Sequence, residues 1–81
     1  MPTVHRARGF KFVIYLNDHP PPHVHVWHAG TVAKIDIGDR DRPPGVIDPG
    51  IMDAPRLREA VRIAEEQQER LLEAWRQCHG P

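Results

Sequence analysis

The sequence feature that most constrains the fold is a pair of alternating segments separated by two small residues. Residues 23–28 and 31–37 alternate apolar and polar side chains, and Ala29-Gly30 stands between them. This pattern predicts a β-hairpin with a two-residue loop, whose register follows by counting outward from the loop. Because side chains alternate across a strand, one face of the hairpin is apolar. The predicted core face consists of Val24, Val26, Ala33 and Ile35.

The opposite face of the hairpin carries side chains that can bind a metal ion or transfer a proton. In the expected register His23 faces Asp36, His25 faces Lys34, and Trp27 lies on the same side. Two histidines separated by one residue of a strand point the same way about 6.5–7 Å apart, so both imidazoles can reach one ion or substrate. Imidazole is the commonest metal ligand and titrates near neutral pH. The face therefore predicts a metal site, acid–base chemistry without a metal, or a plain polar surface.

Three polar residues precede the hairpin and add candidate ligands. Asn17, Asp18 and His19 are followed by three prolines, which favour an extended link to His23. A fully extended link places the Cα atoms of His19 and His23 roughly 12 Å apart, near the limit for two histidines that share an ion, so a turn or a cis proline would help. The candidate metal ligands are Asp18, His19, His23 and His25, for zinc, nickel or manganese. The candidate catalytic residues are His23, His25 and Lys34, and the candidate binding residues are Asn17, Trp27 and Asp36.

The first half of the chain predicts further strands. Residues 10–16 are rich in aromatic and β-branched side chains, and residues 4–7 can form a strand before them, with Arg8-Gly9 as the turn. Residues 38–53 are dense in Asp, Arg, Pro and Gly and are expected to be irregular, although residues 45–47 can add a short edge strand. One face of the second strand is apolar and consists of Phe10, Phe12, Ile14 and Leu16.

The last third of the chain predicts one long helix. Asp53 is a suitable N-cap, Pro55 is tolerated in the first turn, and the helix is expected over residues 54–78. We therefore expect an α+β fold in one domain over residues 1–81, with a small antiparallel sheet of hairpins packed on one face by the long C-terminal helix. The inward positions of the helix, at steps of four and three, are Leu57, Val61, Ala64, Gln68, Leu71, Trp75 and Cys78.

Composition limits the partners and the compartment. The 81 residues carry 11 basic and 11 acidic side chains, and this zero net charge argues against binding nucleic acid or membrane by bulk charge alone. One cysteine, Cys78, allows no internal disulfide, and no apolar run approaches the roughly 20 residues that span a bilayer. With no signal peptide evident, a cytoplasmic protein without membrane contact is expected. So short a chain has a marginal core, so a homodimer, a bound metal or very good packing is expected to add stability.

The sequence also resembles a known family. The opening Met1-Pro2-Thr3-Val4, the central residues 17–26 and the segment 71–75 resemble the small bacterial domain-of-unknown-function 4160 family over nearly the whole chain. This chain departs from the usual pattern in residues 39–53 and at Ala74, where members commonly carry Asn. Members are often encoded beside a second small protein, and such pairs look like type II toxin–antitoxin modules. The characteristic polar positions of the family match Asn17, Asp18, His19, His23 and His25 here.

These observations support two functional hypotheses of different classes. The first is a toxin–antitoxin component that acts as a His-dependent or metal-dependent ribonuclease, in which Lys34 or an arginine offsets phosphate charge. The alternative is a non-enzymatic protein-binding module, an antitoxin or adaptor, in which an exposed strand edge and Trp27 dock a partner while the histidines bind metal or are structural. A small protein encoded nearby, RNA and a second copy of the chain are the expected partners.

Overall fold

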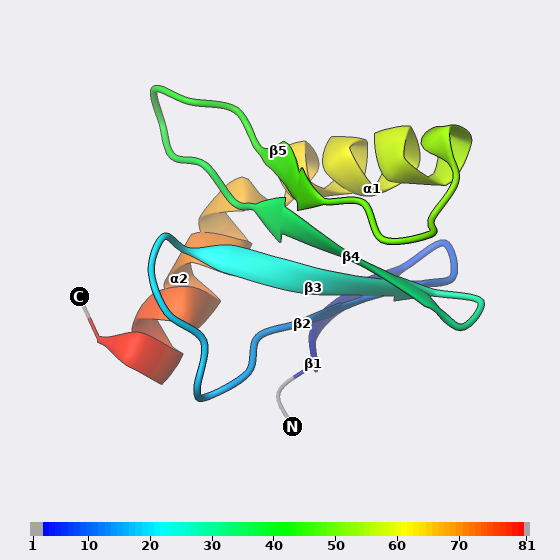
Figure 1. Ribbon diagram of the computed structural model, residues 1–81. Coiled ribbons are helices and arrows are strands. Elements are labelled where there is room, and N and C mark those ends of the chain that lie inside the picture. The colour runs from blue at the N-terminus through cyan, green and yellow to red at the C-terminus, as the bar shows by residue number, and fades with distance from the viewer. Residues whose placement is uncertain (1–2, 81) are drawn as a thin grey trace.

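The structure, a computed structural model, describes residues 3–80 and has the expected α+β architecture. The strands form one antiparallel five-stranded sheet in the order β1-β2-β3-β4-β5, and two helices follow. In Figure 1, α2 lies behind β3 and β4, α1 runs beside β5, and no helix lies in front of the sheet. Residues of both helices join one face of the sheet in the core, and the opposite face is uncovered. The elements are β1 (Thr3–Ala7), β2 (Phe10–Val13), β3 (His23–His28), β4 (Thr31–Asp36), β5 (Gly45–Asp48), α1 (Ala54–Glu66) and α2 (Gln68–His79).

The β3–β4 hairpin has the register expected from the sequence. The six pairs run from His28 opposite Thr31 to His23 opposite Asp36. Ala29 and Gly30 both have positive φ, at 48° and 81°, as a type I′ loop requires. The predicted core face is confirmed, because its four residues are at most 2% exposed.

The core lies between the sheet and the two helices. It is one cluster built from the covered sheet face and from the inner side of each helix, with Ala60, Ile63 and Ala64 from α1 and Leu71 and Trp75 from α2. From β2 and the residue after it come Phe10, Phe12 and Ile14, as expected. Leu16 was expected beside them, but it is 74% exposed, because β2 ends at Val13 and the alternation does not extend to Leu16.

The expectation of one continuous helix over residues 54–78 is wrong. The helix begins as expected, with Asp53 capping the Arg56 N–H at 2.9 Å, but Gln67 leaves helical geometry at φ −111° and ψ 18°. Beside this break, the Gln68 side-chain amide donates to the Ile37 carbonyl at 3.0 Å and to the Arg42 carbonyl at 3.2 Å, which holds α2 to the end of β4. Within residues 3–80, neither helix is both long and apolar enough to cross a bilayer.

The segment between β4 and α1 is irregular apart from one short strand. β5 lies at the sheet edge, where residues 45–47 were expected to add a strand, and it pairs with β4 through a register shift. Before it, an isolated bridge joins Asp39 to Arg42. The Arg42 guanidinium also donates to Asp36 at 2.8 Å, which ties this loop to the last residue of β4.

Candidate metal centre

Three side chains converge at one end of the sheet. Asp18, His23 and His25 each offer a ligand atom, and these atoms all lie within 4.8 Å of one another. Asp18 Oδ1 is 3.3 Å from His25 Nε2 and 3.5 Å from His23 Nε2. The cluster is screened from solvent, because the side chains of Asp18, His23 and His25 are 11%, 8% and 21% exposed. A partly buried set of two imidazoles and a carboxylate is a donor set that transition metals prefer.

The loop between β2 and β3 positions the carboxylate. Asp18 donates its backbone N–H to the Tyr15 carbonyl at 3.1 Å, and its Oδ2 accepts the Tyr15 N–H at 3.0 Å. These two bonds form a closed local turn that fixes the Asp18 side chain. One carboxylate oxygen is thereby used by the backbone, and the other, Oδ1, faces the two histidines. The Pro20–Pro21 peptide bond later in the same loop is cis.

The backbone also fixes the tautomer of His23. The Nδ1 atom of His23 lies 2.9 Å from the Pro21 carbonyl oxygen. A carbonyl oxygen can only accept a hydrogen bond, so Nδ1 carries the hydrogen and donates it. In the neutral ring Nε2 then has a lone pair, and Asp18 Oδ1 lies 3.5 Å from this nitrogen. A cation held between these two atoms would be bound by both.

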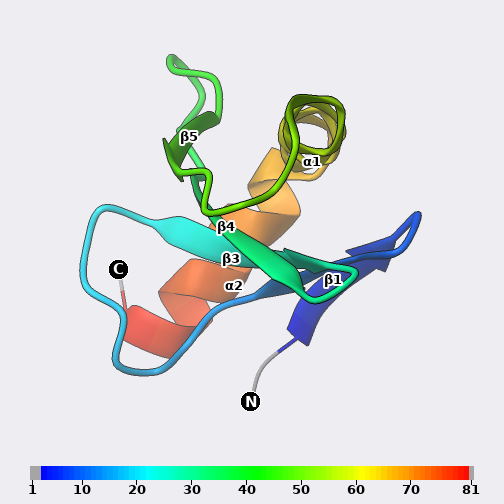
Figure 2. The ribbon, with the colours of Figure 1, turned by 45° about the vertical axis from the view of Figure 1, so that its right-hand side comes forward.

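The C-terminal helix supports the cluster from the side of the core. The His23 ring packs on Trp75 with 5.4 Å between ring centroids, and Trp75 packs on His79 at 4.1 Å. His79 Nε2 in turn donates to the Tyr15 carbonyl at 3.1 Å. Figure 2 shows the loop between β2 and β3 passing beside the C-terminal end of α2, where these contacts lie. Trp75 is the core anchor that its helical position predicts, and it also fixes the plane of the His23 ring.

A second set of aromatic contacts reaches the cluster along the uncovered face. The Tyr15 ring packs edge-on against His25 with 4.7 Å between centroids. The Trp27 indole N–H donates to the Tyr15 hydroxyl at 3.3 Å. Trp27 is therefore linked to the cluster through Tyr15, although no contact joins Trp27 to either histidine among residues 3–80.

The surroundings of Asp18 lower the pKa of its carboxyl group. Burial is the largest single effect on this pKa and raises it, because burial disfavours the charged form of the carboxyl group. The hydrogen bond from the Tyr15 backbone, the hydrogen bond from His25 and the positive charges of His23 and His25 together outweigh burial. The net result is a pKa below the ordinary value of 3.8, so Asp18 is a carboxylate at neutral pH.

Not every residue predicted for the site belongs to it. His19, predicted as a fourth metal ligand, is exposed and is not one of the three converging residues. Asp36 is a predicted binding residue, and its oxygens accept from the Gly38 N–H and the Arg42 guanidinium, both at 2.8 Å. Lys34 lies opposite His25 in the register, as expected, and makes no ion pair within the described part of the chain. Asn17 is exposed.

Sequence reasoning missed one supporting residue. His79 is not among the predicted site residues, yet it packs on Trp75 and donates to the Tyr15 carbonyl. The available signal was its spacing of four residues from Trp75, which places both side chains on one face of a helix.

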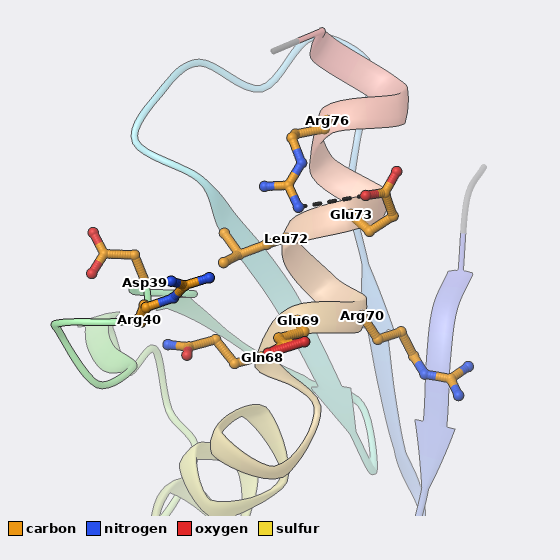
Figure 3. A pocket seen from close by; sticks show the side chains of 8 residues that line it. All are labelled: Asp39, Arg40, Gln68, Glu69, Arg70, Leu72, Glu73 and Arg76. Carbon is orange, nitrogen blue, oxygen red and sulfur yellow. Dashed lines mark hydrogen bonds and ion pairs between the residues drawn. The ribbon is translucent and has the colours of Figure 1, made fainter.

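A wide surface hollow lies away from the cluster. It borders the outer side of α2 and the loop after β4, and Figure 3 shows its lining: Asp39, Arg40, Gln68, Glu69, Arg70, Leu72, Glu73 and Arg76. Within it the Arg76 guanidinium pairs with Glu73 of its own helix at 3.4 Å, while Arg70 points away from Asp39 and Arg40 (Figure 3). The lining includes none of the three converging residues, so we place the site at the cluster rather than here.

The lowered pKa of Asp18 predicts how stability depends on pH. Because the folded pKa lies below the unfolded one, the unfolded chain binds more protons between the two values, and the carboxylate stabilises the fold above the unfolded pKa. This contribution is lost as pH falls through the folded pKa. In metal-free protein, we expect the free energy of unfolding of wild type to exceed that of Asp18→Asn at pH 6 and the difference to shrink below about pH 4. Urea titrations from pH 6 to pH 2.5 measure the free energy of unfolding of both proteins. A difference between them that stays constant over this range contradicts the lowered pKa of Asp18.

Comparison with known proteins identifies the family. No curated protein and no solved structure matches the chain. The family described as Domain of unknown function (DUF4160) matches residues 9–76. This range includes Asp18, His23 and His25 and most of the packing around them, as the sequence resemblance implied. Because the match covers most of its length, the chain belongs to the DUF4160 family.

Proposed function

We propose that this chain binds a divalent transition-metal ion, preferably zinc, between Asp18, His23 and His25, and uses it to cleave RNA as one component of a type II toxin–antitoxin-like pair. The observation that carries the proposal is the bond from His23 Nδ1–H to the Pro21 carbonyl. Histidines that bind metal almost always donate their other ring N–H to a carbonyl or carboxylate, which fixes the tautomer and aims the free lone pair at the ion. His23 has this arrangement, and its Nε2 lies 3.5 Å from the Asp18 carboxylate.

The distances within the cluster support a small ion. Zinc lies about 2.0–2.1 Å from imidazole nitrogen and about 2.0–2.2 Å from carboxylate oxygen, so two ligands at a tetrahedral angle are about 3.3–3.4 Å apart. The separations from Asp18 Oδ1 to the two Nε2 atoms are 3.3 and 3.5 Å. The two distances from Asp18 therefore fit one ion, and the three ligand atoms, which lie within 4.8 Å of one another, would close on it through movement of the imidazoles. Nickel and manganese accept the same donors, but two imidazoles and one carboxylate suit zinc better than manganese.

The number of ligands supports a catalytic ion. Structural zinc sites are closed by four protein ligands, whereas catalytic sites keep three and leave a position for water. Asp18, His23 and His25 supply three, and His19 is exposed and outside the group. A water on zinc has a pKa near 7, so hydroxide is available at neutral pH.

RNA cleavage follows from this chemistry without a further reactant. An ion held by Asp18, His23 and His25 would supply a base for the ribose 2′-hydroxyl and the positive charge that offsets the phosphate. The 2′-oxygen would form a bond to the adjacent phosphorus as the bond to the next 5′-oxygen breaks, and the proton from the 2′-hydroxyl would pass to the departing 5′-oxygen. The products are a 2′,3′-cyclic phosphate and a 5′-hydroxyl. Pairing with a second small protein follows from the family resemblance, in which such neighbours are common.

Metal binding makes the first prediction of this proposal. Untagged wild-type protein is expected to bind about one zinc ion, and removing a ligand in Asp18→Asn or His23→Ala is expected to weaken binding by more than the roughly 10–100-fold that loss of an outer-shell partner costs. Elemental analysis of the purified protein measures the number of zinc ions bound, and zinc titration in competition with a chelator measures the affinity. His19→Ala is the matched control, since it removes an exposed histidine of the same loop and is expected to bind as wild type does. Asp18→Asn keeps the side-chain size, so a lost site is distinguishable from a misfolded protein. Equal zinc affinity in wild type and Asp18→Asn contradicts the metal centre.

RNA cleavage makes the second prediction. Induction of the wild-type chain in a bacterial host is expected to arrest growth, while the His23→Ala/His25→Ala double variant at the same protein level is not, and His19→Ala is expected to behave as wild type. In vitro, zinc-loaded protein is expected to yield fragments that end in a cyclic phosphate, and a chelator is expected to stop the reaction. If folded, zinc-loaded protein leaves both growth and RNA intact, the ribonuclease is excluded and the non-enzymatic binding module takes its place.

A further inference from the structure

The uncovered face of the sheet carries cations in a defined order. The pairing of the strands places Arg6 of β1 beside Lys11 of β2, and Lys11 beside Trp27 of β3. In the next row, His25 of β3 lies beside Lys34 of β4. Directly paired residues of antiparallel strands share a face, so all five side chains belong to the face opposite the core. We call Arg6, Lys11, Trp27 and Lys34 the basic face.

The charges of this face are not balanced locally. Arg6, Lys11 and Lys34 make no ion pair within residues 3–80, whereas Arg8 and Arg42 pair with Glu59 and Asp36. Three acids border this face: Asp36 is held by Arg42, Asp18 belongs to the metal centre, and Asp48 of β5 is paired with Lys34. Strands β1, β2 and β3 contain no acidic residue, so the positive charge of the face is concentrated at Arg6 and Lys11.

An aromatic ring lies among these cations and next to the centre. Trp27 is partly exposed, and its indole N–H is tied to the Tyr15 hydroxyl, so the ring is held in one orientation. Tyr15 packs against His25, and this links the basic face directly to the metal centre. A fixed ring beside cations is the arrangement with which proteins stack a base and neutralise the adjoining phosphates.

We propose that single-stranded RNA binds across the basic face, with its backbone along Arg6, Lys11 and Lys34 and one base stacked on Trp27. The inference deepens the proposed function, because it names the surface that would bring RNA to the metal centre. From β1 to β4 the face spans three strand spacings, about 14–15 Å, which is enough for a few nucleotides. A nucleic acid fits this face better than an apolar protein surface does, because the exposed large apolar side chains are not residues of the basic face: Leu16, Val46, Ile47 and Ile51.

The test measures binding in the absence of metal, so that no cleavage occurs and the two proposals can fail separately. A fluorescently labelled single-stranded RNA of about 12 nucleotides is titrated with full-length protein in a chelator, at several salt concentrations. Each cation that contacts a phosphate of a single strand contributes about 0.7 to the slope of log K against log salt. Wild type is therefore expected to show a slope that the Arg6→Ala/Lys11→Ala/Lys34→Ala variant lowers by about 2, with at least tenfold weaker binding.

A matched control separates this face from net charge. Arg56→Ala/Arg58→Ala/Arg62→Ala removes the same charge from exposed positions of α1, and it is expected to leave both affinity and slope close to wild type. Stacking is tested independently in Trp75→Phe, where Trp27 is the only remaining tryptophan and its fluorescence is expected to fall on RNA binding. Weak binding by wild type, or equal losses in the two triple variants, overturns the basic face while leaving the metal centre standing. Wild-type protein that binds RNA through this face but takes up no zinc in the zinc titration overturns the zinc-dependent ribonuclease and keeps the basic face.

Discussion

The register of the β3–β4 hairpin is the constraint on which the rest of the structure depends. A slip of one residue would turn every side chain of β3 to the opposite face. Val24 and Val26 are fully buried in the native register, so a slip would expose them and force His23 and His25 into the core. Burial of the apolar face thus fixes the direction of both imidazoles. The same register aligns Lys34 with His25 and brings Lys11 beside Trp27 through β2.

The core and the candidate centre share one aromatic side chain. Trp75 belongs to the hydrophobic cluster between sheet and helices, and it also stacks on His23 and His79. His23 itself is 6% exposed and hydrogen-bonded to the backbone, so its ring has little freedom to turn. A ligand whose position is fixed in advance loses little entropy when an ion binds. In a chain this short, a bound ion would also add stability that a marginal core does not supply.

The sequence predicted the parts of this structure that depend on local periodicity. Alternation around Ala29-Gly30 was enough for the hairpin, its register and the shared direction of His23 and His25. Alternation could not show which acidic side chain lies beside these two histidines. Asp36 is directly opposite His23, but its oxygens are taken by Gly38 and Arg42. Asp18 comes from a loop whose path depends on tertiary contacts.

The two other errors of the sequence-based prediction, the single long helix and the inward position of Leu16, also arise where local periodicity does not decide the structure. No helix-breaking residue marks the turn between α1 and α2, because Gln67 and Gln68 are ordinary helix formers. The break coincides with contacts from Gln68 to carbonyls distant in sequence, and no local pattern records these. Leu16 continues the alternation of β2 in the sequence, yet the strand has already ended.

The central claim is that Asp18, His23 and His25 together hold one ion. X-ray absorption at the zinc edge, on protein loaded with about one equivalent of zinc, reads the ligands of that ion directly. The account predicts two imidazole nitrogens at about 2.0–2.1 Å, with the remaining ligands oxygen at about 2.0–2.2 Å. A spectrum with oxygen ligands alone and no imidazole scattering would contradict it.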